Sequence, residues 1–273
     1  MEILIESLLP WKAAAVGLWL AGFFLLERLR PAASYPKSDD AAPPWRRVLR
    51  NATLWGINSA LSPLIVIPVS YWAAAQGLGW RPAWWSGWGG LLLDVLLLDF
   101  LIYWWHRANH VVPVLWRFHE VHHLDRILDS TTAVRFHFGE VLLSAGARAA
   151  VIVLFGIPVA SVLVFETLVL IASIFHHSNL RLPSGLEAAL SRVVITPGIH
   201  WVHHHKVRRD TDSNYGTILS VWDPLFGSRS KTQRSLTMPI GVEGRREQPL
   251  PALLARPFGF ARKASPADGQ GAG

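Results

Sequence analysis

Histidines occur in this chain at spacings that suit metal binding. All 12 histidines lie between positions 106 and 205 of a chain of 273 residues. One pair is four residues apart, and two H-x-x-H-H motifs follow it. The residues of these three groups are His106 and His110, then His119, His122 and His123, then His200, His203 and His204. Positions i, i+3 and i+4 share one face of a helix, so each group directs its rings toward a common point. Because imidazole is the commonest metal ligand among side chains, we predict that these histidines bind metal and form the catalytic site.

The number of histidines predicts two metal ions rather than one. His177 joins the three groups as a further candidate ligand. A closed zinc site uses about four ligands and an octahedral metal about six, so this set exceeds the needs of one ion. Two adjacent metals held mainly by neutral imidazole suggest oxygen-activating iron, although zinc and copper also accept imidazole. A haem with two axial histidines would leave most of the pattern unexplained.

Other polar residues near the motifs are candidates for further roles. His137, in the segment RFHFGE, is a predicted ligand because it begins an apolar hairpin on the metal side, although it could instead bond only the backbone. The roles of His176 and His205 stay open. A carboxylate can accept the second N–H of a ligating imidazole and so fix its tautomer. The carboxylates that could do so are Asp99, Glu120, Asp125 and Glu140. For Glu120, a solvated surface position is an equal alternative.

The composition indicates that helices inside a membrane position these histidines. The chain is 51% hydrophobic and only 16% charged, and it has 14 tryptophans, which exceeds what a soluble domain needs for its core. The net charge of +7 does not indicate nucleic-acid binding, because the basic residues flank apolar spans and no nucleic-acid motif accompanies them. Without cysteine the chain has no disulfide and no Cys-ligated zinc or iron–sulfur cluster. No G-x-G-x-x-G motif indicates a built-in nicotinamide or flavin domain.

Long apolar runs predict an all-α integral membrane bundle of about four spans, the last two forming a helical hairpin. The runs are residues 3–26, 53–76, 89–105 and 141–175, the last one interrupted at Gly156-Ile157-Pro158. For residues 3–26 a cleaved signal peptide is the alternative, but the run is long, its start is acidic and no cleavage-site pattern follows. Residues 31–50 are predicted to be a polar connection, and Ser265 to Gly273 to be disordered.

Arginine distribution predicts the orientation of the bundle. The connection before the second span carries Arg46, Arg47 and Arg50, whereas the 77–87 loop has only Arg81. By the positive-inside rule the first connection is cytoplasmic. Counting spans then places residues 106–140 and everything after 176 on that side, so the histidine-rich metal-binding helical region is expected at the cytoplasmic face of a multi-pass protein.

Six segments in a fixed order give the chain a family resemblance. HRANH, HEVHH, RFHFGE, FHHSNLRLP, HWVHHH and NYGTILSVWDPLFG resemble the membrane fatty acid hydroxylase superfamily, and within it the sterol desaturase-like proteins. The resemblance covers about residues 94–227. It implies a division into N-terminal transmembrane helices (1–88), a catalytic domain (89–227) and a polar tail (228–273). The histidines of the three groups match the family's ligand boxes, and His137 and His177 match further histidine positions of its pattern.

The resemblance also implies an activity. Such a protein is a non-haem di-iron oxidoreductase that uses O2 and two electrons to hydroxylate or desaturate a lipid, whether sterol-like, fatty acyl or ether lipid. Its substrate would enter from the membrane, and its electrons would come from a ferredoxin or a b-type cytochrome with its reductase, docking on the basic face. Two alternatives remain: a membrane di-zinc hydrolase, which needs neither O2 nor a reductant, and a non-catalytic metal-binding membrane protein.

Overall fold

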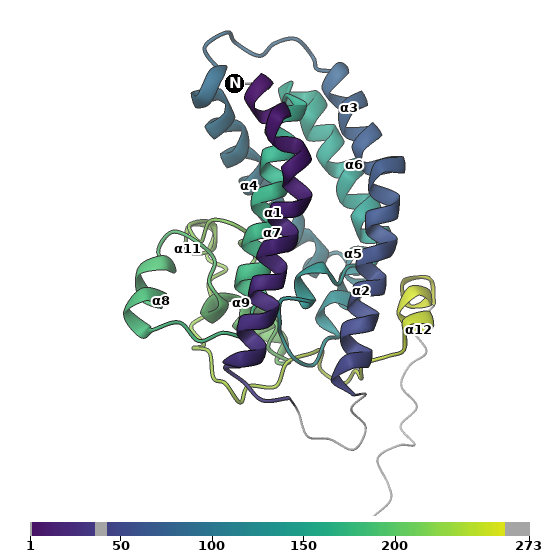
Figure 1. The fold of residues 1–273 in the computed structure, drawn as a ribbon, viewed down its shortest axis with the longest axis vertical. Coiled ribbons are helices and arrows are strands. Elements are labelled where there is room, and N and C mark those ends of the chain that lie inside the picture. The colour runs from purple at the N-terminus through teal and green to yellow at the C-terminus, as the bar shows by residue number, and fades with distance from the viewer. Residues whose placement is uncertain (1, 36–42, 260–273) are drawn as a thin grey trace, which may run out of the picture.

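The regular structure of the chain is helical wherever the structure describes it. The computed structural model describes residues 2–35 and 43–259, and within these ranges the only β-type pairings are two isolated bridges. The long helices are α1 (Glu2–Leu29), α2 (Pro44–Leu61), α3 (Ile67–Ala75), α4 (Gly87–Val111), α5 (Pro113–His123), α6 (Phe138–Phe155) and α7 (Val159–His177) (Figure 1). Short helices follow: α8 (Ser184–Leu190), α9 (Pro197–His203), α10 (Arg208–Thr211), α11 (Trp222–Leu225) and α12 (Leu250–Ala255). The predicted all-α class is confirmed, while the predicted disorder of Ser265 to Gly273 lies outside the described residues.

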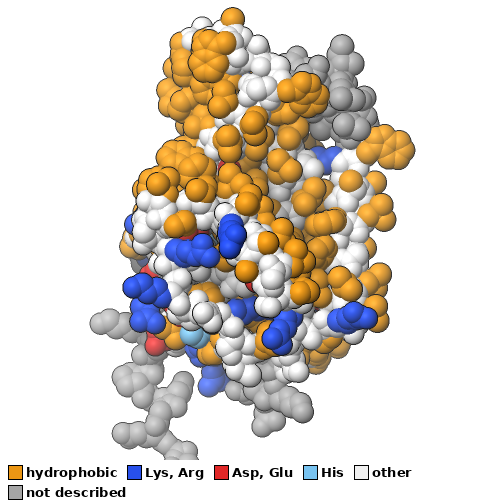
Figure 2. Space-filling model, turned by 90° about the vertical axis from the view of Figure 1, so that its left-hand side faces the viewer, with side chains coloured by type: hydrophobic (Ala, Val, Ile, Leu, Met, Phe, Trp, Pro, Cys, Tyr) orange, Lys and Arg blue, Asp and Glu red, His pale blue; other side chains and the backbone are white. Residues whose placement is uncertain are grey.

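Among the described residues, four helical segments are long and apolar enough to cross a membrane. They are Pro44–Ala75, Gly87–Val111, Phe138–Phe155 and Val159–His177. Figure 2 shows apolar side chains covering the upper part of the molecule, whereas Lys and Arg side chains gather in the lower half. The last two segments form the predicted hairpin, with Gly156 in the left-handed conformation (φ 60°) at the end of α6. The predicted span 3–26 lies on α1, which packs along α7 (Figure 1).

The start of the second span corrects the sequence prediction. Helix α2 begins at Pro44, so the arginines assigned to a polar connection lie on the helix itself. Arg47 is buried, and its guanidinium contacts Asp125 (Nη2–Oδ2, 2.8 Å) and Asp129 (Nη1–Oδ2, 2.7 Å). These ion pairs compensate the burial of the charge and let the helix extend beyond its apolar run. A π-helical turn, Ser62–Val66, joins α2 to α3 and accommodates Pro63 within the continuous segment.

Buried carboxylates in α4 are paired, as their position in a membrane helix requires. Asp94 forms a bidentate pair with Arg81 (2.8 and 2.9 Å), which ties the 77–86 loop to the bundle. Asp99 accepts hydrogen bonds from the backbone N–H groups of Ile218 and Leu219 and from the Trp222 indole. The loop before α11 is therefore held against α4, close to the histidines at the end of that helix.

The turn between α4 and α5 brings the first two histidine groups together. Val112 has an extended backbone (φ −93°, ψ 114°), as expected for a residue before proline, and Pro113 starts α5. The two helices pack against each other, and α9 packs against the end of α7. The histidine-bearing ends of α4 and α7 thus lie at the same end of the bundle as α5 and α9 (Figure 1).

Candidate metal centre

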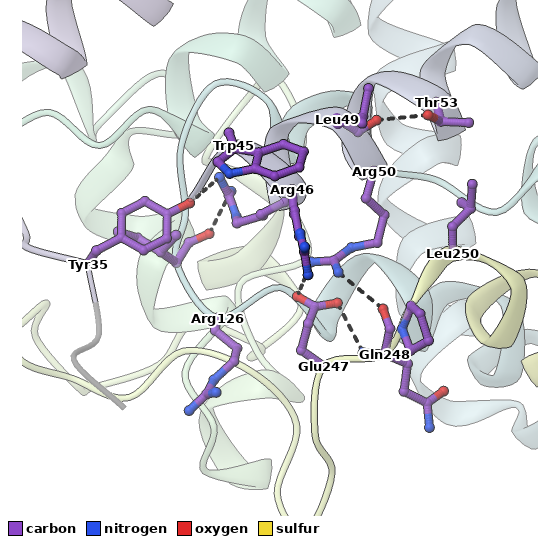
Figure 3. Close-up of a pocket in the computed structure, with 13 residues that line it drawn as sticks. Tyr35, Trp45, Arg46, Leu49, Arg50, Thr53, Arg126, Glu247, Gln248 and Leu250 are labelled. Carbon is purple, nitrogen blue, oxygen red and sulfur yellow. Dashed lines mark hydrogen bonds and ion pairs between the residues drawn. The ribbon is translucent and has the colours of Figure 1, made fainter. Parts of the chain in front are cut away.

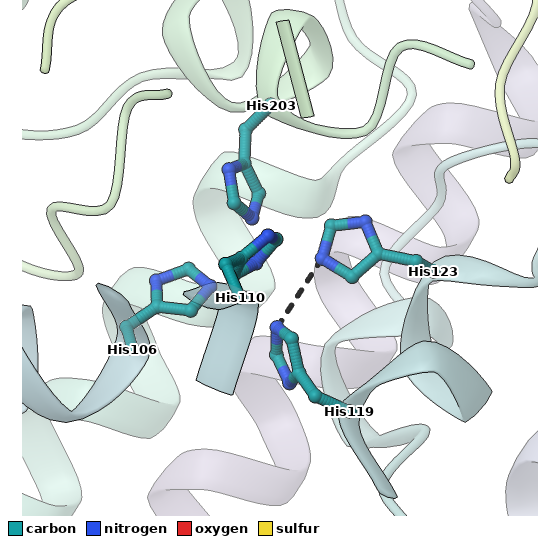
Figure 4. A group of neighbouring side chains, drawn as sticks. All are labelled: His106, His110, His119, His123 and His203. Atoms are coloured by element: carbon teal, nitrogen blue, oxygen red, sulfur yellow. Dashed lines mark hydrogen bonds between the residues drawn. The ribbon is translucent and has the colours of Figure 1, made fainter. Parts of the chain in front are cut away.

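Nine of the ten predicted ligands assemble into two groups of side chains. The first group contains His106, His110, His119, His123 and His203, and the second contains His122, His177, His200 and His204. In each group one ring nitrogen from every member lies within 4.8 Å of the others. Figure 4 shows the first group, with its five rings converging from several helices on one centre. The groups adjoin, since the His123 and His204 rings stack with centroids 4.2 Å apart.

Helices α5 and α9 contribute to both groups. His119 and His123 are four residues apart on α5 and belong to the first group, while His122 faces the second. On α9, His203 turns to the first group, and His200 joins the second. Helix α4 completes the first group with its last turns, and α7 completes the second with its last residue.

Most of the rings are fixed through Nδ1. Four of them bond backbone carbonyls: His106 to Tyr215 (2.8 Å), His122 to Arg135 (3.1 Å), His177 to Ser173 (2.8 Å) and His203 to Ser213 (2.6 Å). A carbonyl oxygen can only accept, so Nδ1 carries the proton and Nε2 presents a lone pair. Glu140 Oε1 lies 2.7 Å from His119 Nδ1, and Asp212 Oδ1 lies 3.3 Å from His110 Nδ1.

Several Nε2 atoms then face one another at short distance. The separations are 3.1 Å between His122 and His177, 2.9 Å between His177 and His200, and 3.1 Å between His200 and His204. Since Nδ1 holds the proton of both His122 and His177, no proton lies between their Nε2 atoms and the lone pairs repel. A cation bound at about 2.0–2.1 Å from each nitrogen would place neighbouring ligand atoms at about this separation.

Burial favours the neutral form of several of these rings, which is the form that binds a metal. Burial first, and then neighbouring histidines, lower the pKa of His122, His200 and His204 well below the ordinary value. In the first group, the Nε2 atoms of His110 and His203 are buried without a hydrogen-bond partner among the described residues. Buried polar atoms are rarely left unpaired, so the donor set of both groups fits metal ions.

Three histidines lie outside the groups. His137 Nδ1 accepts a hydrogen bond from the Gly139 N–H (2.9 Å) at the start of α6, and its Nε2 lies 3.1 Å from the Leu254 carbonyl oxygen. The ring that was predicted as a ligand is therefore occupied at both nitrogens. His176 packs against the His200 ring (centroids 4.1 Å apart), and His205 Nδ1 lies 2.8 Å from Asp210 Oδ2.

The candidate acidic residues have different partners. Glu140 contacts the His119 ring, as described above, but Glu120 pairs with Arg256 (2.7 Å), Asp125 with Arg47, and Asp99 with the 218–222 segment. The backbone carbonyls that hold four of the rings were not predicted, because a carbonyl is present at every residue and carries no sequence signal. Asp212, by contrast, lies close behind the last histidine motif, and that proximity could have suggested it.

Two surface cavities lie near the polar end of the bundle, and neither is lined by a histidine. One, of about 530 Å³, lies beside the first turns of α2, where Arg46 and Arg50 point toward Glu247 (Figure 3). The other, of about 950 Å³, is lined by the 236–242 segment, with Arg126, Lys206 and Arg245 among its residues. The histidine groups are thus buried beneath the surface rather than open to these cavities.

Comparisons with known proteins agree with this arrangement. A family model described as "Fatty acid hydroxylase" matches residues 91–228. The chain is 29% identical over 196 residues to an ornithine lipid hydroxylase OlsE of Rhizobium tropici, covering 72% of this chain and 58% of that protein. It is 32% identical over 162 residues to an alkylglycerol monooxygenase of Xenopus tropicalis, covering 58% and 34%. It is 31% identical over 222 residues to a cholesterol 25-hydroxylase-like protein of Danio rerio, covering 76% and 83%.

The matched part of the chain spans about a third to three fifths of the first two relatives. No solved structure matches the chain. The family match nevertheless covers the stretch that holds both histidine groups and the Asp99-bound loop. This chain belongs to the fatty acid hydroxylase family.

Proposed function

We propose that this protein is a membrane-bound non-haem di-iron oxidoreductase that uses O2 and two electrons to hydroxylate or desaturate a lipid. The observation that carries the proposal is the pair of adjacent all-histidine groups whose Nε2 atoms face one another at 2.9–3.2 Å. The relatives named as lipid hydroxylase and alkylglycerol monooxygenase support the same class of reaction.

The two groups would each hold one iron ion, and together the ions would supply the O2 and C–H oxidation chemistry. The chain's own residues hold the rings in place. Carbonyls of the backbone fix Nδ1–H of four ligands, and Glu140 accepts from His119, which raises the basicity of that ring. Burial of the groups excludes bulk water from the site. His137 stays a predicted ligand without support from its position.

The membrane supplies the substrate in this proposal. Candidate ligands lie at the ends of α4 and α7, and both helices are long and apolar enough to cross the bilayer. A lipid can therefore approach the histidines along these helices without leaving an apolar environment. The exact lipid and the choice between hydroxylation and desaturation depend on which carbon is held beside the centre.

Electrons would come from a separate protein, because the sequence has no cysteine for an iron–sulfur cluster. A ferredoxin or b-type cytochrome with an acidic face fits the basic residues at the polar end, Arg126, Lys206 and Arg245 among them. We place this end on the cytoplasmic side, as the arginine distribution predicts.

Metal content of detergent-purified protein tests the proposal. The wild type should contain about two irons per chain, and the variant His122→Ala with His203→Ala, which removes one ligand from each group, should lose both. His205→Ala is the matched control, since His205 lies outside both groups and is partly exposed. Iron-loaded protein with a reductant should then oxidise membrane lipids only in the presence of O2.

Three results would refute the oxygenase assignment. Protein that binds no stoichiometric metal would refute the metal centre. Protein that binds two zinc ions and releases lipid fragments without O2 would favour the hydrolase. If cells that express the wild type and cells that express the ligand-deficient variant have the same lipid composition, a non-catalytic protein is favoured.

A further inference from the structure

Three charged side chains meet inside the membrane-spanning part of the bundle. Arg148 of α6 pairs with Glu166 of α7 (Nη2–Oε1, 3.1 Å), and Lys12 of α1 lies 3.8 Å from the other oxygen of Glu166. We call these three residues the mid-membrane cluster. Their side chains are 17–24% exposed, so each can be reached from outside the protein. Ionisable groups at this depth are costly and are usually found where a substrate or ion must be handled.

The cluster lies near the middle of the membrane. Arg148 is eight residues before Gly156 and Glu166 eight residues after Pro158, which places both about 12 Å from the turn of the hairpin. Glu166 is 11 residues before His177, or about 16 Å from the second histidine group. The hydrocarbon core of a bilayer is about 30 Å thick, so both distances place the cluster within the apolar part of the spans.

The cluster has an excess of one positive charge. It contains two cations and one carboxylate, and no second carboxylate among the described side chains forms an ion pair with Lys12 or Arg148. In addition, Arg148 Nε is buried without a hydrogen-bond partner in the described part of the chain. An uncompensated charge and an unpaired donor are both costly in an apolar medium, and one anionic group would compensate both.

The faces that carry the cluster also lead to the histidines. On α6, Glu140, Ser144 and Arg148 are spaced four residues apart and share one side of the helix, and Glu140 contacts His119. On α7, Glu166 and His177 are three turns apart and again share one side. A molecule bound at the cluster and extended along these helices would therefore point its far end at the candidate metal centre.

We propose that the mid-membrane cluster binds the carboxylate of an amphiphile dissolved in the bilayer, with the apolar chain of that molecule extending along α6 and α7 toward the histidines. Arg148 and Lys12 bind the carboxylate, and Glu166 positions the two cations. Binding needs no metal. That the bound molecule is the substrate rests on the proposed function.

Equilibrium binding of radiolabelled palmitate to the full-length protein in nanodiscs tests the proposal, with hexadecanol and methyl palmitate as uncharged competitors. Arg148→Gln leaves the cluster neutral and should weaken binding about tenfold or more, whereas Glu166→Gln leaves two positive charges and should strengthen it. Both variants break the same ion pair, so a purely structural role predicts effects in the same direction. Opposite directions support the carboxylate site.

Two further variants complete the experiment. Lys12→Gln keeps the closer Arg148–Glu166 pair, so it should fold, and it should weaken palmitate binding because it also neutralises the cluster. Arg209→Gln is the matched control, since its side chain is 85% exposed in the polar region, and it should change nothing. Equal binding by wild type, Arg148→Gln and Lys12→Gln, or equal competition by hexadecanol, overturns the inference. If the protein binds palmitate without metal but oxidises no lipid when it is loaded with iron, the proposed function is refuted and the carboxylate site is not.

Discussion

Replacing Glu140 provides a selective test of how the first histidine group is held. Glu140 Oε1 accepts from His119 Nδ1 at 2.7 Å, and the carboxylate is buried. The variant Glu140→Ala removes this acceptor and frees the ring to rotate or to change tautomer. Loss of such a partner typically weakens metal affinity about 10–100-fold, or about 1.4–2.7 kcal/mol. The ion of the second group should keep its affinity, because His122 is fixed by the Arg135 carbonyl instead.

Competition with a chelator measures this difference. Iron-loaded wild type titrated with a chelator should release both ions over one range of chelator concentration. Glu140→Ala should release them over two separate ranges of concentration, one for each ion. Glu140→Gln retains an amide oxygen that can accept the same hydrogen bond, so its effect should be smaller than that of the alanine variant. Glu120→Ala is the matched control, since Glu120 is a buried carboxylate whose described partners are Arg245 and Arg256 rather than a ring. Equal weakening of both ions in Glu140→Ala, or the same release from Glu120→Ala, would refute the reasoning.

Other expectations follow from the ion pairs and from the metal groups. Arg47→Met leaves the buried Asp125 without its ion-pair partner and Asp129 with only the partly exposed Arg28, so it should lower the free energy of unfolding in detergent by about 3–5 kcal/mol. Arg46→Met, at an exposed position without an ion pair to the described residues, should change it little. Burial alone would raise the pKa of Asp125, but Arg47 lowers it below the usual range, so the stabilisation is present above the unfolded-state pKa of about 4 and is lost as the pH falls below it. Unfolding followed from neutral to acidic pH should show a steeper loss in wild type than in Arg47→Met, and parallel curves would contradict this. Removing metal with a chelator should lower the unfolding temperature and adding iron should restore it, because ions that bind only the folded state stabilise it. An unfolding temperature that is the same with and without metal would count against both metal sites.

The sequence predicted which histidines would converge, because helical spacing and residue type are both visible in it. The H-x-x-H-H motifs fold as helical turns or helix ends, and their rings converge as the spacing requires. It predicted their surroundings less well. Glu120 and Glu140 were both predicted as possible partners of a ring, with a solvated surface position as the equal alternative for Glu120. Glu120 follows His119 directly and turns about 100° away on α5, toward Arg256. Only tertiary packing of α6 against α5 decides that Glu140 meets the ring.

Helix boundaries were uncertain where charge and apolar pattern disagree. Residues 44–50 are rich in arginine and were predicted to be a connection, yet they form the first turns of α2. The partners that make this possible, Asp125 and Asp129, lie about 80 residues away in sequence, so hydropathy could not reveal them. His137 was predicted to be a ligand because it begins an apolar hairpin on the metal side, and in the structure its nitrogens lie against the Gly139 N–H and the Leu254 carbonyl oxygen. Sequence alone could not predict these two contacts, because both are made to the backbone.

The two H-x-x-H-H motifs divide between the groups in a way that explains why each motif has three histidines. In α5 the i and i+4 residues, His119 and His123, face the first group, and the i+3 residue, His122, faces the second. The motif that begins on α9 reverses this, because His200 and His204 face the second group and His203 faces the first. Each group thus takes the i, i+4 pair of one motif and the i+3 residue of the other. A single metal would need only the pairs, so in the proposed two-metal centre the third histidine would let each motif contribute ligands to both ions. If this is correct, His203→Ala should weaken the same ion as Glu140→Ala, although His203 lies more than 60 residues away in sequence, and His122→Ala should weaken the other.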